Sequence, residues 1–239
     1  MILGVDVFSG YGVIDWKKVA AAGVRFAWVK CTEGNEARRN DSRFTYNVAE
    51  AMSAGIAVGA YHFSYPLPSN GVVGRSPVEQ AERFFDVSKG LGSRVGELSP
   101  ALDMEWPPSN EFDKWGCKPA QVAEWCGRLA ERVSVLFGRT PIIYTYPWWW
   151  KHVSQGDVRW AAQCPLWMAN YTHAGPGMPI GKSPTVPKPW ASWAAWQFSA
   201  DGSTERIPGI PACPVDRDCI KDETTFDLLT GRLDPAEAA

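Results

Sequence analysis

The chain has 239 residues, of which 45% are hydrophobic and 21% charged, so it can bury a large core as a globular protein. Its formal net charge of -2 excludes the strongly basic surface that attracts nucleic acid or anionic membranes. No apolar run approaches about 18 residues, so no segment is expected to span a bilayer. We expect neither a nucleic-acid nor a membrane partner, and we expect a monomer.

Strand-like and helix-like segments alternate from the first residue. The predicted strands are residues 3–7, 25–30, 57–63, 100–106, 141–145, 166–169, 194–198 and roughly 206–210. Asp15, Asp41 and Ser76 are predicted to cap three helices, and Pro119 opens a fourth that Gly138 ends. Residues 148–150, three consecutive tryptophans, are predicted to lie in a loop.

The alternation fails after residue 169. Residues 171–189 are rich in Gly and Pro, and the strands at 194–198 and 206–210 are predicted to form a hairpin through Asp201-Gly202. We predict one catalytic domain over residues 1–230 and a short polar tail over residues 231–239. Met1 is followed directly by a strand-like segment, so no signal peptide is expected.

Repeated βα units predict a parallel sheet, and about eight strands in one domain predict an α/β barrel of the TIM type. The barrel is expected to be irregular, because its last strands lack proper helices. Active sites of such barrels lie at the C-terminal ends of the strands. The side chains at those ends are acids surrounded by aromatic and amide groups: Asp6, Glu33, Tyr61, Asp103, Glu105, Tyr144, Asn170, Tyr171, Trp196, Gln197 and Asp216.

Asp103 and Glu105 end the predicted strand at residues 100–106. Side chains two residues apart on a strand point to the same face, with their Cα atoms roughly 6.6 Å apart. Two carboxylates so close resist ionising together, so the pKa of one should rise. A protonated carboxyl group beside an ionised one is the arrangement that cleaves glycosidic bonds. For an isolated Asp-x-Glu, two solvated acids at a strand end would be the simpler interpretation.

Short motifs along nearly the whole chain resemble the family 25 glycoside hydrolases, which are the CH-type lysozymes or N-acetylmuramidases. The matching segments are residues 4–7, 14–16, 22–23, 26–27, 30, 32–34, 54–56, 59–63, 102–105, 141–145, 165–171, 196–198 and 215–216. The resemblance implies a flattened, irregular barrel of five helices and eight strands. It also implies hydrolysis of the β-1,4 bond between N-acetylmuramic acid and N-acetylglucosamine in bacterial peptidoglycan.

The resemblance also implies roles for four acids. Glu105 corresponds to the catalytic acid of the family and Asp103 to the aspartate that assists it, while Asp6 and Asp216 match two further acids. Asp218 is the alternative to Asp216, since both lie in one short segment. The attacking group is either water or the acetamido group of the sugar itself, and the sequence leaves both open.

Seven further residues are predicted to bind the sugar rings through stacking, hydroxyl contacts or hydrogen bonds to N-acetyl groups. They are Tyr61, Tyr144, Asn170, Tyr171, Trp196, Gln197 and Glu33. For the aromatic members core packing is the alternative, and for the polar members it is a loop hydrogen bond, a helix cap or a salt bridge. The thirteen tryptophans fit either a large core or a carbohydrate groove.

Two other classes of function are open to the same chain. A chitinase-like glycosidase would require two more acids ahead of Asp103, and residues 98–105 lack them. A catalytically inactive glycan-binding barrel would not require the four acids to be kept together. We expect a protein that acts on the bacterial cell wall. It is either cytoplasmic until a phage-type release or a secreted enzyme whose leader was removed.

The six cysteines and three histidines form no zinc-binding pattern, so we expect no metal and no cofactor. Cys213 and Cys219 flank Asp216 at equal distance along the chain, and this spacing predicts a disulfide that holds Asp216 in the groove. Two free thiols are the alternative, in a reducing compartment.

Overall fold

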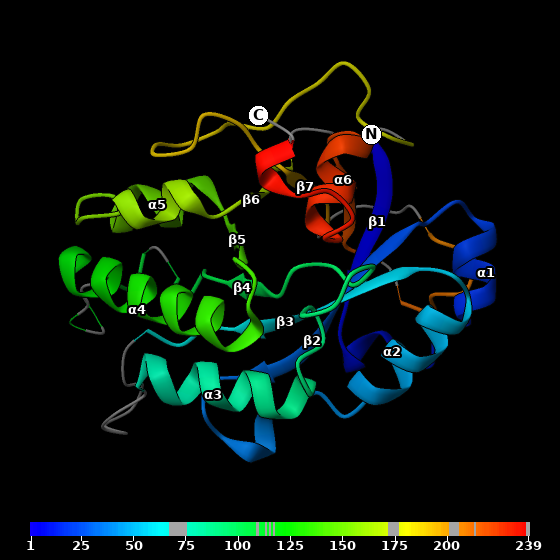
Figure 1. Ribbon diagram of the computed structural model, residues 1–239, viewed down its shortest axis with the longest axis horizontal. Helices are drawn as coiled ribbons and strands as arrows, with labels where there is room; N and C mark the ends of the chain where they lie inside the picture. Colours follow the sequence, from blue (N-terminus) through cyan, green and yellow to red (C-terminus); the bar gives the residue numbers. More distant parts are fainter. Residues whose placement is uncertain are drawn as a thin grey trace.

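The computed structural model describes residues 1–66, 76–108, 110–112, 114, 116, 118–171, 177–200, 206–212 and 214–237. Eight strands form a closed barrel in which each strand pairs with the next, and β8 closes on β1 (Figure 1). The strands are β1 (Ile2–Val7), β2 (Phe26–Glu33), β3 (Ala57–Phe63), β4 (Ala101–Asp103), β5 (Ile142–Thr145), β6 (Leu166–Ala169), β7 (Ala195–Ser199) and β8 (Arg217–Ile220). The predicted α/β barrel of eight strands is confirmed.

The first seven strands run parallel, and β8 runs antiparallel to both of its neighbours. The prediction of a last strand at residues 206–210 is wrong. Ile207 and Ile210 are buried there, but they pack as part of a turn whose Gly209 carbonyl accepts a hydrogen bond from the Asp15 amide at 2.8 Å. The predicted hairpin at Asp201-Gly202 lies outside the described residues.

In the described part of the chain, six α-helices lie around the barrel: α1 (Trp16–Ala21), α2 (Phe44–Ser53), α3 (Pro77–Ser88), α4 (Pro119–Phe137), α5 (Pro147–Val153) and α6 (Glu223–Leu229). The described residues also include four short 3-10 helices: η1 (Ser9–Tyr11), η2 (Ala37–Arg39), η3 (Arg159–Gln163) and η4 (Pro235–Glu237). None of the described helices is long and apolar enough to cross a membrane. The division into residues 1–230 and 231–239 stays a prediction.

Side chains cap the helices largely as expected. The Asp15 and Ser76 side chains accept hydrogen bonds from backbone amides in the first turns of α1 and α3. Asp41 accepts from the Arg43 amide instead, and α2 begins one residue after that. The predicted loop at residues 148–150 is wrong, because Pro147 occupies the first position of a helix, where its lack of an N–H costs nothing. α6, which Asp222 caps, was not predicted from the sequence.

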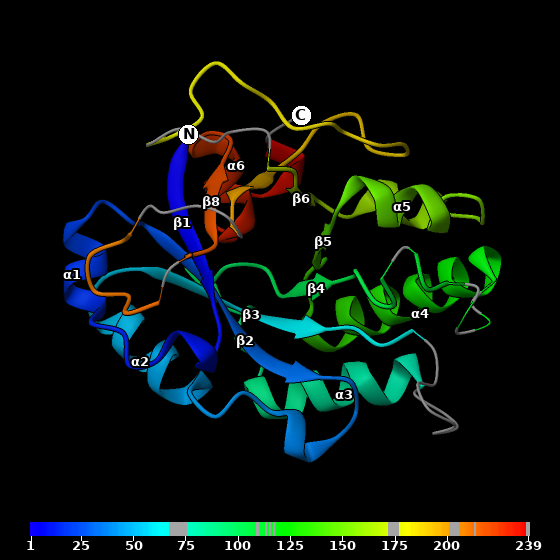
Figure 2. The same ribbon diagram turned by 180° about the vertical axis from the view of Figure 1, so that it is seen from behind.

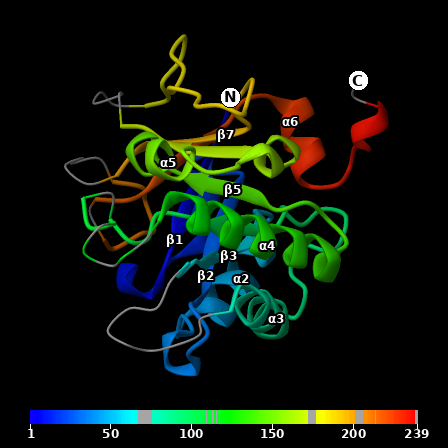
Figure 3. The same cartoon turned by 90° about the vertical axis from the view of Figure 1, so that its left-hand side faces the viewer.

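The helices cover the barrel in two groups. α1 and α2 lie at one side, and α3, α4 and α5 follow one another across the opposite side (Figures 1, 2 and 3). α3 packs against α4, and an ion pair between Arg132 and Glu82 at 2.7 Å joins them. α6 lies beside the N-terminal end of β1 (Figures 1 and 2). The loops that follow the parallel strands therefore converge on the other end of the barrel.

Bulky side chains fill the barrel interior below the C-terminal ends of the parallel strands. The indoles of Trp28 and Trp167 stack with ring centroids 4.4 Å apart, and both are almost fully buried. Gly4 on β1 provides the space for a neighbour, since a Cβ atom there would come within 2.2 Å of the Phe26 ring. Among the described residues, the interior below the C-terminal ends of the strands is thus a packed core.

The predicted disulfide between Cys213 and Cys219 is not supported. Cys219 is a buried free thiol on β8, where it lies 3.7 Å from the sulfur of Met1. Cys213 lies outside the described residues. Asp216 is held instead by a hydrogen bond from the Tyr11 hydroxyl.

Candidate active site

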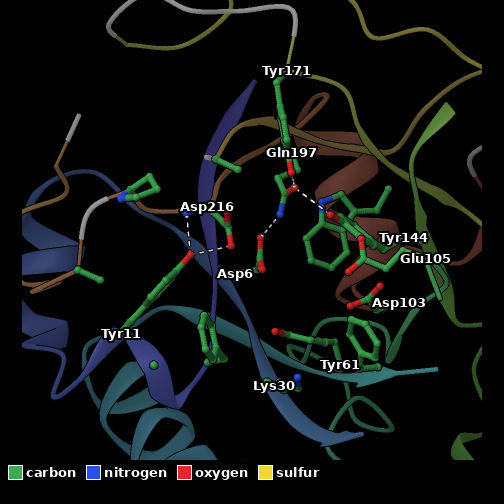
Figure 4. A pocket seen from close by; sticks show the side chains of 17 residues that line it. Asp6, Tyr11, Lys30, Tyr61, Asp103, Glu105, Tyr144, Tyr171, Gln197 and Asp216 are labelled. Atoms are coloured by element: carbon green, nitrogen blue, oxygen red, sulfur yellow. Dashed lines mark hydrogen bonds between the residues drawn. The ribbon is translucent and has the colours of Figure 1, made fainter. Parts of the chain in front are cut away.

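A pocket of about 510 Å³ opens at the C-terminal end of the parallel strands (Figure 4). Most of its lining residues are acidic or aromatic: Asp6, Phe8, Gly10, Tyr11, Lys30, Tyr61, Phe63, Asp103, Glu105, Tyr144, Trp167, Tyr171, Gln197, Ala200, Ala212, Pro214 and Asp216. The four predicted catalytic acids all belong to this lining, and so do four of the seven predicted sugar-binding residues.

Asp103 and Glu105 reach the pocket from the end of β4. The strand itself ends at Asp103, but the amide of Met104 still donates to the Tyr144 carbonyl at 2.9 Å, so the backbone stays extended beyond it. Met104 points away into the core, with 1% of its surface exposed, and its two neighbours therefore share the pocket face. The predicted same-face arrangement is thus completed by Glu105, two residues past the end of the strand.

Burial raises the pKa of both carboxyl groups. The pKa of Glu105 rises to about 7, because the group is removed from water and because Asp216 adds a nearby negative charge. The pKa of Asp103 is also well above its usual value, through burial and the charge of Glu105. No hydrogen-bond donor among the described residues reaches Asp103 Oδ1. The pair therefore holds a proton near neutral pH, which titrates as a property of both groups.

Asp6 and Asp216 form the opposite wall of the pocket. Asp6 is the penultimate residue of β1, and Asp216 immediately precedes β8. Because β8 is antiparallel, its beginning lies at the same end of the barrel as the ends of the other strands. The Tyr11 hydroxyl donates to Asp216 Oδ2 at 2.6 Å and accepts from the Asp216 amide at 3.2 Å, which fixes this acid from η1.

An amide side chain links two tyrosines to the acids. Gln197 on β7 donates from Nε2 to Asp6 Oδ2 at 2.7 Å, and its Oε1 accepts from the hydroxyls of Tyr144 at 2.9 Å and Tyr171 at 2.6 Å (Figure 4). Tyr144 is buried on β5, whereas Tyr171 is 51% exposed at the rim. Tyr61, from β3, completes the aromatic lining.

Lys30 carries the only cationic side chain among the described lining residues. Its Nζ lies 2.8 Å from Glu33 Oε2 and 4.9 Å from the centre of the Phe63 ring. Its charge lowers the pKa values of Asp103 and Glu105, against the rise that burial causes. Lys30 and Tyr11 are not among the predicted site residues, although the position of Lys30 near the end of a barrel strand is a signal that could have identified it.

Three predicted sugar-binding residues lie outside the described lining. The Trp196 side chain is fully buried in the core, and its Nε1 donates to the Asn170 carbonyl at 2.8 Å. The Asn170 side chain accepts from the Thr185 amide at 2.9 Å and so holds a loop. Glu33 forms salt bridges with Lys30 and Arg39, which was the predicted alternative to sugar binding for this residue.

Asp218, the alternative to Asp216, lies deeper. It is fully buried inside the barrel, where Oδ1 accepts from Trp167 Nε1 at 2.8 Å. Asp216 is the one of the two that lines the pocket. Among the residues that the structure describes, no group of three or more His, Cys, Asp or Glu side chains is arranged to hold a metal ion.

Comparisons with known proteins agree on one family. The model of glycosyl hydrolases family 25 matches residues 5–207. Lysozyme M1 of Streptomyces globisporus is 32% identical over 208 residues, which are 87% of this chain and 65% of that protein. The N,O-diacetylmuramidase of Chalaropsis sp. is 28% identical over 213 residues, which are 87% of this chain and 94% of that protein.

Solved structures show the same likeness in three dimensions. The crystal structure of the bacterial lysozyme from Streptomyces coelicolor has a TM-score of 0.79 and 30% sequence identity to this chain, covering 97% of this chain and 98% of that one. The family match spans most of the barrel, including three of the four acids that line the pocket, Asp6, Asp103 and Glu105. The chain belongs to family 25 of the glycosyl hydrolases.

Proposed function

We propose that the protein hydrolyses the β-1,4 bond between N-acetylmuramic acid and N-acetylglucosamine in bacterial peptidoglycan. The observation that supports this most is the carboxyl pair of Asp103 and Glu105 in one acidic, aromatic pocket, with the pKa of Glu105 raised to about 7. The names of two relatives, a lysozyme and a diacetylmuramidase, support the choice of peptidoglycan as substrate.

In this proposal Glu105 is the general acid. A carboxyl group with a pKa near the working pH can both hold a proton and give it to the leaving glycosidic oxygen. Asp103 accepts from the 2-acetamido group of the sugar or stabilises the positive charge that develops at the anomeric carbon. Its Oδ1, which no described donor reaches, is the acceptor available for this role.

The remaining groups of the pocket bind and orient the sugar. Asp216 contributes negative charge on the wall opposite Asp103 and Glu105, which favours an oxocarbenium-like transition state, and Asp6 orients Gln197 on the same wall. The rings of Tyr61 and Tyr171 offer apolar faces to sugar rings, and their hydroxyls offer polar contacts.

The experiment uses purified peptidoglycan and Glu105→Gln, with Glu131→Gln as the matched control because Glu131 is exposed on α4. Glu105→Gln should lower the rate of clearing by on the order of 10² or more and still bind the insoluble glycan, whereas the control should behave as wild type. A Glu105→Gln rate within about threefold of wild type would reject Glu105 as the acid.

The reaction products show which glycosidic bond is cleaved. After borohydride reduction, the new reducing ends should be muramitol, identified by mass spectrometry. Glucosaminitol would instead show cleavage of the other glycosidic bond and overturn the proposal. Faster hydrolysis of chitin oligosaccharides than of peptidoglycan would favour the chitinase-like alternative, and binding without any release would favour the inactive glycan-binding barrel.

A further inference from the structure

A second pair of carboxyl groups lies inside the barrel, beneath the pocket. The antiparallel register places Asp218 opposite Gly4, the one position of β1 without a side chain, and Asp6 lies two residues further along the same face of β1. The Phe26 ring fills the space over Gly4 itself, and the side chains of Asp6 and Asp218 form a hydrogen bond between the two paired strands. Asp6 lines the pocket, whereas Asp218 is fully buried below it.

Such a pair needs one shared proton, because two adjacent carboxylates in a buried site cannot both be ionised. Trp167 Nε1 can only donate, so Asp218 Oδ1 is an acceptor, as Asp6 Oδ2 is toward Gln197, and the shared proton must lie between the two remaining oxygens. Asp218 Oδ2 is buried, and no described donor outside the pair reaches it. A proton on Asp6 is the group that can satisfy this oxygen.

The surroundings favour the protonated form of the pair. Burial raises the pKa of Asp6 and of Asp218, and the charge of Asp216 raises both further. The other titratable groups close to Asp6 are the tyrosines of the pocket lining, Tyr11, Tyr61, Tyr144 and Tyr171. Tyrosines are neutral at working pH and do not oppose the shared proton.

The Gln197 side chain connects the pair of Asp6 and Asp218 to the side of the pocket that faces the substrate. Asp6 Oδ2 accepts from Gln197 Nε2, which turns Gln197 Oε1 toward the hydroxyls of Tyr144 and Tyr171. Each hydroxyl then donates its single proton to Gln197, so its lone pairs are what it offers to a ligand. The two tyrosines would accept hydrogen bonds from the N–H and O–H groups of an N-acetylated sugar.

We propose that Asp218 is a positioning residue that shares one proton with Asp6 and thereby sets the orientation of Gln197 and of the Tyr144 and Tyr171 hydroxyls. The inference rests on the proposed function for its substrate. Asp218 itself touches no substrate, since it lies outside the lining of the pocket.

Two substitutions separate positioning from mere packing. Asp218→Asn keeps an acceptor for Trp167 and gains an N–H donor for Asp6, which then ionises, so the pair keeps its single negative charge. Asp218→Ala removes both contacts. Asp218→Ala should lower kcat by about tenfold or more, and Asp218→Asn should recover most of this loss, to within about threefold of wild type. Thr145→Val is the control, a buried hydroxyl on β5 that makes no hydrogen bond to described residues.

Infrared spectroscopy tests the proton itself. In a Glu105→Gln background, which removes one protonated carboxyl group, the parent protein should keep a deuterium-sensitive carbonyl band of a protonated carboxyl at neutral pH. Adding Asp218→Asn should lower the intensity of that band, because Asp6 is then ionised, whereas any contribution from Asp103 stays the same. A band of unchanged intensity would overturn the shared proton, even if Asp218→Ala fails to fold.

The kinetic results decide the second half of the inference. Folded Asp218→Ala enzyme with wild-type kcat, or an Asp218→Asn enzyme as slow as Asp218→Ala, would overturn the positioning role. The infrared band does not depend on activity, so it tests the pair even if the protein proves to cleave a different bond. Failure of the proposed function is therefore distinguishable from failure of this inference.

Discussion

The ionisation of Glu105 should weaken the fold, and replacing this residue should remove the effect. The pKa of Glu105 rises from 4.5 to about 7 on folding, through burial and the charge of Asp216. Each unit corresponds to about 1.4 kcal/mol, so the ionised form costs roughly 3 kcal/mol relative to the protonated form. That is a large share of the stability of a typical domain.

The sign follows from the direction of the shift. A carboxyl group with a raised pKa binds its proton more tightly in the folded state, so its contribution to stability is present below pH 4.5 and is lost as pH rises through about 7. Glu105→Gln cannot ionise. The variant should match wild type at acidic pH and exceed it by roughly 3 kcal/mol above neutral pH.

Urea denaturation of wild type, Glu105→Gln and the exposed control Glu131→Gln over a pH series measures this difference. The free energy of unfolding of the control should follow that of wild type at every pH. A constant difference between Glu105→Gln and wild type across the series would refute the reasoning, because it would mean that the ionisation of Glu105 is not coupled to folding.

Three further predictions concern the pocket and the barrel. The rate should depend on pH in a bell-shaped way, because one carboxyl group must be ionised and another protonated. Lys30→Met should move this profile to higher pH by on the order of 0.5–1 unit, because the lysine lowers the pKa values of Asp103 and Glu105. A shift of the profile to lower pH would contradict this. Gly4→Ala should lower the free energy of unfolding by about 3 kcal/mol, because its Cβ would meet the Phe26 ring; unchanged stability in urea would show that the ring can move. Activity should persist in EDTA, and loss restored by a divalent ion would contradict the metal-free mechanism.

The sequence could predict the acids that end parallel strands. Asp6 and Asp103 are each at or next to the end of an apolar segment, and in a barrel such ends must meet at one edge. Glu105 followed from its spacing to Asp103, and this spacing holds although β4 ends earlier than predicted. These inferences needed only the alternation of strands and helices along the chain.

The residues of β8 could not be recognised in the same way. Arg217 and Asp218 are charged, so the strand lacks the apolar pattern that marks a buried strand. Their burial depends on distant partners, since Asp218 accepts from Trp167 and Arg217 donates to the Gly177 carbonyl at 3.2 Å. Tyr11 is likewise brought to Asp216 across 205 positions of sequence.

The tryptophan excess had two open interpretations, and burial favours the core. Trp16, Trp28, Trp149, Trp150, Trp167 and Trp196 are almost fully buried. The indole N–H groups of Trp149 and Trp150 donate to the carbonyls of Pro107 and Lys188. These indoles therefore join loops to the barrel as well as filling it. Among the other described tryptophans, Trp106 and Trp160 are half-buried, and Trp148 at the start of α5 is 68% exposed.

The antiparallel direction of β8 explains how one short segment places Asp216 in the pocket and Asp218 in the barrel interior below it. If β8 ran parallel to its neighbours, its first residues would lie at the closed end of the barrel, far from Asp6. Because it runs antiparallel, Asp216 enters at the open end and Asp218, two residues later on the same face, lies one layer below. The upper acid faces the substrate pocket, and the lower one meets Asp6 in the interior. A single reversal thus couples the chemistry of the pocket to the polar pair beneath it.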